Sequence, residues 1–261
     1  MAATVIVAAV SVHAQQNFVP RKPTDADWAA VAKLPDFTGV WEATFGPPPA
    51  RGGQPARGAT QAPGAAGGRG RLGLAAGPQL TPAYAEKRRE NQAKGAEDSQ
   101  AANCLPPGMP GIMGQPYPME FLLTPGLVTI VIEAYSQVRH IYTDGRPLPD
   151  DPDPKFFGTS IGRWENGTLV AETIGFSPQT EIASNTPHSD KMKIVERFAL
   201  ADPDTMTIET TITDPEALTA PYTTTRTLRR HRAWTIAEYI CEENNRNSVD
   251  QNGKAGINIK K

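Results

Sequence analysis

The sequence predicts a mainly β protein, an antiparallel up-and-down barrel of about ten strands with one or two short helices. Three observations lead to this prediction. Beyond residue 118 the chain is a succession of short runs rich in Thr, Val and Ile. Turn signals such as Asn166-Gly167 separate these runs. The chain also holds 23 glycines and 25 prolines in 261 residues, a frequency of turn formers that excludes a helical bundle.

The N-terminal residues predict export, to the periplasm or as a secreted protein. Residues 1–14 form an apolar run that ends in small or short residues at the two positions read by a signal peptidase. A buried N-terminal strand is the alternative, because the basic residues that usually begin a signal peptide are absent. In the N-terminal segment that follows, residues 15–35, Thr24 is expected to cap a short helix over 25–33.

A single barrel domain is expected over residues 36–246, and one long insertion interrupts it. Residues 46–78 consist almost wholly of Gly, Pro, Ala, Gln and Arg, so they bury too little apolar surface to fold and predict a disordered insertion. A Thr-Pro pair then begins a predicted helix over 81–97. Residues 247–261 are expected to form a flexible C-terminal tail.

The predicted strands lie on both sides of this insertion. Their ranges are 38–45, 119–124, 127–133, 137–143, 159–165, 168–174, 191–200, 205–213, 223–232 and 234–241. No helix long enough for a crossover is predicted after residue 118, so we expect neighbouring strands to be antiparallel. Closing the sheet into a barrel would remove both of its edges, and a two-sheet sandwich is the alternative.

The two cysteines, Cys104 and Cys241, predict one disulfide bond. Neither has a second thiol or a histidine at metal-ligand spacing. An even pair of cysteines is typical of an exported chain, in which disulfides persist. Two unpaired buried thiols are the alternative.

Composition and spacing argue against several classes of function. The formal net charge of −2 argues against a nucleic-acid binder with a basic face, and no apolar run is long enough for a membrane-embedded protein. No cofactor and no metal are expected, because His140 and His188 are not at zinc-motif spacing. The acidic residues at 150–153 lack the pattern of a calcium loop and favour a solvated loop. Ser160 and Ser189 lack the context of a hydrolase nucleophile.

Strand alternation selects the candidate catalytic residues, because every second side chain of a barrel strand points into the lumen. This count places Glu196, His140 and Glu172 inside, among apolar neighbours. A carboxyl group and an imidazole there could move a proton to or from a bound molecule, with the glutamate pKa raised by desolvation. The alternative is a satisfied polar network that stabilises the core. The candidate ligand-binding residues are Tyr142, Arg163, His188, Arg226 and Trp41.

The first predicted strand begins with Asp36-Phe37-Thr38-Gly39-Val40-Trp41, which contains a Gly-x-Trp motif. This motif resembles the opening strand of the lipocalin-like (calycin) superfamily. The resemblance implies that the tryptophan plugs the closed end of the barrel. It also implies that an arginine from a late strand packs across the ring, and Arg226 and Arg229 are the candidates.

A larger part of the chain is similar to a family of uncharacterised exported bacterial proteins. The similar segments are NCLPPGMP (103–110), EFLLTPG (120–126), RHIYTDGRPLP (139–149), SIGRWENGTLVAET (160–173), HSDKMKIVER (188–197) and EYICEENNR (238–246). This resemblance covers about two-thirds of the chain. It implies the fold and the export, and it implies no activity.

The function expected from these features is the binding of a small, partly apolar molecule in the lumen of an exported barrel. The alternative is a cofactor-free acid/base enzyme, an isomerase, lyase or hydratase that acts on such a molecule in the same cavity. A third class is an envelope scaffold that contacts a partner through the 46–78 insertion. The sequence leaves open whether the protein is an enzyme.

Overall fold

The computed structural model describes residues 22–44, 77–94, 100, 103–241, 247–249 and 255–257. The predicted signal peptide lies outside these residues. Of the predicted insertion, only the last two residues, 77 and 78, lie within them. The statements about structure below concern the described residues.

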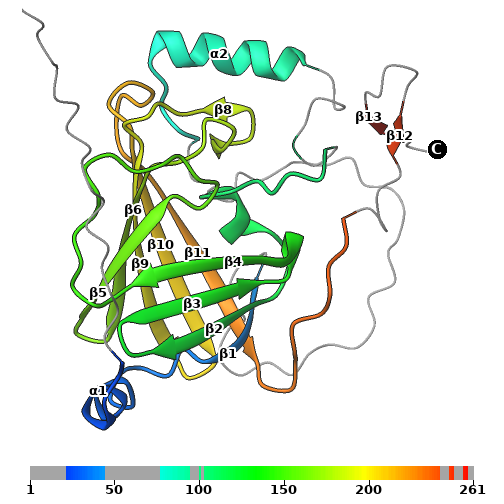
Figure 1. Ribbon diagram of the computed structural model, residues 1–261. Helices are drawn as coiled ribbons and strands as arrows, with labels where there is room; N and C mark the ends of the chain where they lie inside the picture. The colour runs from blue at the N-terminus through cyan, green and yellow to red at the C-terminus, as the bar shows by residue number, and fades with distance from the viewer. Residues whose placement is uncertain are drawn as a thin grey trace, which may run out of the picture.

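Nine strands close into one barrel (Figure 1). They are β1 (Gly39–Ala43), β2 (Met119–Thr124), β3 (Leu127–Ile132), β4 (Gln137–Tyr142), β5 (Thr159–Glu165), β6 (Thr168–Ile174), β9 (Lys193–Asp202), β10 (Thr205–Thr213) and β11 (Tyr222–His231). Their order around the barrel is β1-β11-β10-β9-β6-β5-β4-β3-β2. The mainly β barrel is therefore confirmed, and the sandwich alternative is excluded.

The barrel differs from the predicted one in two respects. The strands β4 and β5 pair in parallel, so the sheet is mixed rather than purely antiparallel. The extended, proline-rich residues 143–158 make this crossover without a helix, which the prediction did not allow for. In addition, residues 234–241 contain no strand, so the predicted tenth barrel strand is wrong.

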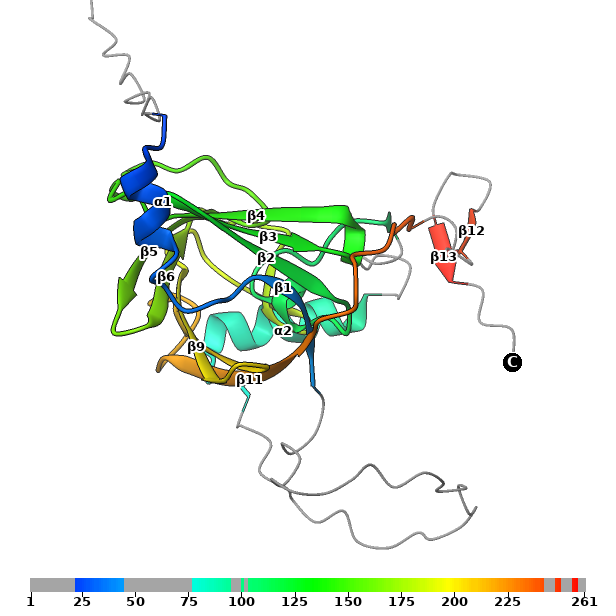
Figure 2. The same ribbon diagram turned by 90° about the horizontal axis from the view of Figure 1, so that it is seen from below.

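The two α-helices lie at opposite ends of the barrel (Figures 1 and 2). The helix α1 (Asp25–Val31) begins with the predicted cap, in which the Thr24 backbone N–H donates to the Asp27 carboxylate at 2.7 Å. The helix α2 (Pro82–Ala93) follows Thr81, whose hydroxyl donates to the Glu216 carbonyl instead of to the helix. Each helix therefore starts where the sequence predicts, by a different contact.

Two short hairpins lie outside the barrel. The strands β7 (Glu181–Ala183) and β8 (Thr186–Pro187) form one, and α2 packs against β8. The strands β12 (Asn247–Val249) and β13 (Ala255–Ile257) form the other. The second hairpin falls in the predicted flexible tail, so that tail contains regular structure.

Side chains fill the interior of the barrel. Trp41, Phe121 and Phe198 are fully buried at its centre. At the α2 end, the 3-10 helix η3 (Gly111–Gly114) and the residues before it bury Met109 and Ile112 completely. The barrel is thus a packed core, closed at one end by this inserted segment.

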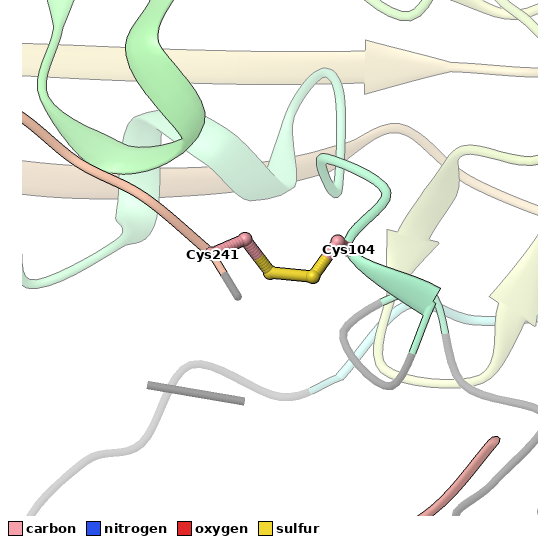
Figure 3. Close-up of a disulfide and its surroundings, with 2 residues drawn as sticks. All are labelled: Cys104 and Cys241. Carbon is pink, nitrogen blue, oxygen red and sulfur yellow. A yellow bond between two sulfur atoms is a disulfide. The ribbon is translucent and has the colours of Figure 1, made fainter. Parts of the chain in front are cut away.

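The predicted disulfide is confirmed. Cys104 and Cys241 are bonded, with their Cα atoms 5.8 Å apart (Figure 3). The bond joins the segment that leads into η3 to residues 234–241, which follow the last barrel strand. None of the described helices has the length and apolarity that crossing a bilayer requires.

Candidate functional site

Glu196 points into the barrel, as the alternation of β9 predicts, and is fully buried. It forms an ion pair with Arg139 of β4, a residue that the sequence analysis did not select. Arg139 Nη1 donates to Glu196 Oε1 at 3.2 Å, and Nη2 donates to Oε2. Both carboxylate oxygens are thus engaged, so Glu196 is held by a cation rather than poised as a free base.

Two hydroxyl groups complete this buried polar cluster. Arg139 Nη2 lies 3.2 Å from Thr173 Oγ1 of β6 and 3.4 Å from Ser160 Oγ of β5. The two hydroxyl oxygens lie 2.8 Å from each other. Together with Glu196 of β9, the cluster links four barrel strands. This arrangement resembles the alternative interpretation of a polar network in the core, except that Arg139 Nε is buried without a hydrogen-bond partner.

The cluster lies at the weakest junction of the barrel wall. The parallel strands β4 and β5 share only two residue pairs, Ile141 with Ser160 and Tyr142 with Ile161. Arg139 comes before the paired part of β4, where β5 offers no backbone partner. Its side chain therefore bridges across the barrel at the point where the two strands diverge.

His140 and Tyr142 point out of the barrel, so their predicted place in the lumen is wrong. Arg139 and Ile141 occupy the inward positions of β4, and their neighbours must face outward. His140 is exposed and stacks on Tyr142 with ring centroids 6.3 Å apart. The guanidinium of Arg146 covers the same tyrosine ring at 3.8 Å. These residues form a surface cluster beside β4.

Glu172 and Arg163 also lie on the outer face, which corrects the prediction for both. Leu169 and Thr173 take the inward positions of β6. Glu172 accepts from Arg163 Nη1 at 2.8 Å and forms an ion pair with Lys193 Nζ at 2.5 Å. These hydrogen bonds, first from Lys193 and then from Arg163, lower the pKa of Glu172. The candidate catalytic residues thus lie on two sides of the barrel wall and share no cavity.

His188 lies in the connection between β8 and β9 and is held on both sides. Its Nδ1 is 2.7 Å from the Ser189 carbonyl oxygen. Its Nε2 is 3.0 Å from the Ser177 carbonyl and 2.9 Å from the Thr180 hydroxyl. The imidazole therefore joins two loops at the α2 end of the barrel, and His188, a candidate ligand-binding residue, has both ring nitrogens engaged by these loops.

Arg226 belongs to the inward-facing set of β11 but lies beyond the end of β1, where its side chain is exposed. Its guanidinium packs against Gly114 of η3 so closely that a Cβ atom at Gly114 would collide with it. Arg226 therefore covers the segment that plugs this end of the barrel.

Trp41 is fully buried beneath an arginine from a late strand, as the resemblance to lipocalin-like proteins implies. The arginine is Arg230 rather than Arg226 or Arg229. Arg230 pairs directly with Trp41 in the register of β1 and β11, whereas Arg229 points outward. The Arg230 guanidinium lies 4.5 Å from the centroid of the Trp41 ring and donates to Asp36 Oδ2 at 2.9 Å.

A pocket of about 250 Å³ lies at the α1 end of the barrel, between α1 and the strand ends. Its described lining residues are Asp27, Ala30, Val31, Leu34, Leu123, Thr124, Pro125, Gly126, Val128, Thr143 and Trp164. Leu123, Val128 and Trp164 point into the barrel from β2, β3 and β5, so the pocket is a mouth of the lumen. Strand alternation could have identified these three inward-facing residues. No local sequence signal indicates that α1 lies over them.

The polar groups of this pocket are few. Thr124 Oγ1 already donates to the Leu127 carbonyl at 3.2 Å. The Asp27 carboxylate accepts from the Thr24 backbone and hydroxyl, and it is the one charged side chain of the described lining. Thr143 adds a hydroxyl, and Trp164 adds an aromatic surface. The arrangement can hold an apolar body and one hydrogen-bonding group.

Comparison with protein-family models finds none that matches the chain, and comparison with curated proteins finds no match either. Within the described part of the chain, no group of three or more His, Cys, Asp or Glu side chains could hold a metal ion.

Proposed function

We propose that this protein is an exported binder of a small, mostly apolar molecule without negative charge, held between α1 and the adjacent mouth of the barrel. The observation that carries the proposal is the pocket itself, whose wall is mainly aliphatic and aromatic. The disulfide supports export, because such bonds persist in oxidising compartments.

The size of the pocket limits the ligand. A volume of about 250 Å³, at ~30 Å³ for each water-sized group, accommodates roughly eight non-hydrogen atoms. One aromatic ring with a short polar substituent has this size. The ring would pack against Leu34, Leu123 and Trp164, and the substituent would bond to the Thr143 hydroxyl.

The charge of the lining disfavours an anionic ligand. Its described residues include the Asp27 carboxylate and no Lys, Arg or His. An anion would lose its hydration here without gaining an opposite charge, and it would be repelled by Asp27. We therefore expect benzyl alcohol to bind more tightly than benzoate, which has nearly the same shape.

The acid/base enzyme would need another constellation of residues, because His140 and Glu172 lie outside the barrel wall that buries Glu196. The geometry thus supports binding better than turnover.

The test is calorimetric titration of the mature protein with benzyl alcohol, benzylamine and benzoate. We expect a Kd on the order of 1 mM for benzyl alcohol, since ~0.5 kcal/mol for each of its non-hydrogen atoms gives about −4 kcal/mol. Ala30→Trp would fill the pocket from an exposed helix position and abolish binding. Ala29→Trp, on the same helix but outside the lining, is the matched control. Equal binding by both variants, or preference for benzoate, would overturn the proposal.

A further inference from the structure

Three of the six tyrosines of the chain lie together outside the barrel. One of them, Tyr239, belongs to the disulfide-bonded segment 234–241, here called the strap, and the other two, Tyr117 and Tyr135, contact it. The Tyr239 ring of the strap lies 5.2 Å from the Tyr135 ring and 5.5 Å from the Tyr117 ring, measured between centroids. The Tyr135 and Tyr239 rings are inclined by 39°. Tyr239 thus contacts two tyrosine rings; its contact with Tyr135 is the shorter and more nearly stacked, because the Tyr117 ring meets it edge-on at 86°.

The backbone around Tyr135 is shaped for this contact. Tyr135 and Ser136 form the 3-10 helix η4 (Ala134–Ser136) with Ala134, and both have positive φ, 59° and 50°. Two consecutive non-glycine residues in this region cost about 1–3 kcal/mol each, so surrounding contacts must hold them. Ser136 Oγ donates to the Tyr239 carbonyl at 3.1 Å.

A second contact fixes the strap from the other side of η4. The Ala237 backbone N–H donates to Glu133 Oε2 at 3.0 Å. The disulfide at Cys241 then anchors the end of the strap. The strap is therefore tied down on both sides of Tyr239, and the ring is held against Tyr135.

We propose that Tyr135 and Tyr239 form a site of oxidative modification, at which a peroxide-driven one-electron oxidant couples the two rings into dityrosine. Each phenol loses one electron and one proton to give a phenoxyl radical. The radicals join through a new carbon–carbon bond between ring positions adjacent to the oxygens, and each ring regains its hydroxyl by tautomerisation. Two phenols and one hydrogen peroxide thus yield one dityrosine and two water molecules.

The surroundings favour coupling within this pair. Burial raises the pKa of Tyr135 and of Tyr239, so each is a neutral phenol that loses a proton together with its electron. Neither ring must move far, because they are already in contact. The product would tie the strap to η4 by a bond that reductants do not cleave. The strap would then stay in place after the neighbouring disulfide is reduced.

The test oxidises the full-length, disulfide-bonded protein with photoactivated tris(bipyridine)ruthenium and persulfate, then maps cross-linked peptides by mass spectrometry. We expect an intramolecular link between Tyr135 and Tyr239, with a yield independent of protein concentration. Tyr239→Phe should lose the dityrosine fluorescence. Tyr142→Phe, at a tyrosine stacked on His140, should retain it. After disulfide reduction, the oxidised protein should resist cleavage of the strap after Glu238 by a glutamyl endopeptidase better than the unoxidised protein.

The outcomes that contradict the proposal are equally specific. A link that maps mainly to another tyrosine, a yield that rises with protein concentration, or unchanged fluorescence in Tyr239→Phe would each overturn it. Circular dichroism shows whether Tyr239→Phe is folded. The variant removes only one hydroxyl, so we expect its spectrum to match that of the wild type. If it does not, Tyr135→Phe serves in its place.

Discussion

Replacing Glu196 by leucine would leave the Arg139 guanidinium buried without its negative partner. The Arg139 side chain is 1% exposed and the Glu196 side chain 0%, so neither can exchange its partner for water. Removing one partner of a buried ion pair costs about 3–5 kcal/mol, because the remaining charge is uncompensated. For a chain of this size, we expect the melting temperature of Glu196→Leu to fall by about 6–20 °C.

The assay is thermal unfolding, followed by circular dichroism, of the wild type, Glu196→Leu, Arg139→Met and the double variant. The free energy of unfolding of the double variant should lie within about 1–2 kcal/mol of the wild-type value, because two apolar side chains leave no buried charge without a partner. Glu172→Gln is the matched control, since its partly exposed ion pairs contribute at most about 1 kcal/mol. A Glu196→Leu protein that melts like this control, or a double variant as unstable as the two single losses combined, would refute the reasoning.

Three further perturbations test other parts of the structure. Arg230→Ala should destabilise by about 2–3 kcal/mol and shift the fluorescence of the uncovered indole to the red, because the guanidinium covers the ring; unchanged emission would contradict this. Burial alone would raise the pKa of Asp214, but the hydrogen bonds it accepts lower it below 3.8. The ionised Asp214 carboxylate therefore makes its full contribution to the free energy of unfolding above about pH 4. This contribution is lost as the pH falls through the folded-state pKa. Asp214→Ala should cost about 2–3 kcal/mol at pH 7 and less in acid, whereas exposed Asp190→Asn should cost little at any pH. The unreduced, denatured protein should show no free thiol, and replacing Cys104 and Cys241 by serine should lower the free energy of unfolding by up to about 5 kcal/mol.

The elements that depend on neighbouring residues could be predicted from the sequence. Asn166 and Gly167 both adopt the positive φ that their hairpin turn requires, 48° and 82°. Thr24 caps α1 as expected. Glu196 could be placed inside because the other face of its strand carries charges, whereas its own face is apolar. In each case the signal lies within a few residues of the feature.

Strand alternation failed where both faces of a strand are ambiguous. Residues 137–142 place Arg139 with Ile141 and His140 with Val138, so neither face is apolar throughout. The prediction placed His140 inside together with Val138, on the face opposite to Arg139. It could not include the glutamate 57 residues away that makes a buried arginine tolerable.

The sequence by itself determined the fold class, the turns, the helix starts and the pairing of the two cysteines, because local backbone preference and cysteine number specify these. Only the tertiary structure decided the parallel closure of β4 on β5, the choice of Arg230 to cover Trp41, and the pocket beneath α1. The physical reason is that these features depend on register and solvation between segments far apart in the chain. Hydrophobic periodicity records which residues prefer burial and not which partner they meet there.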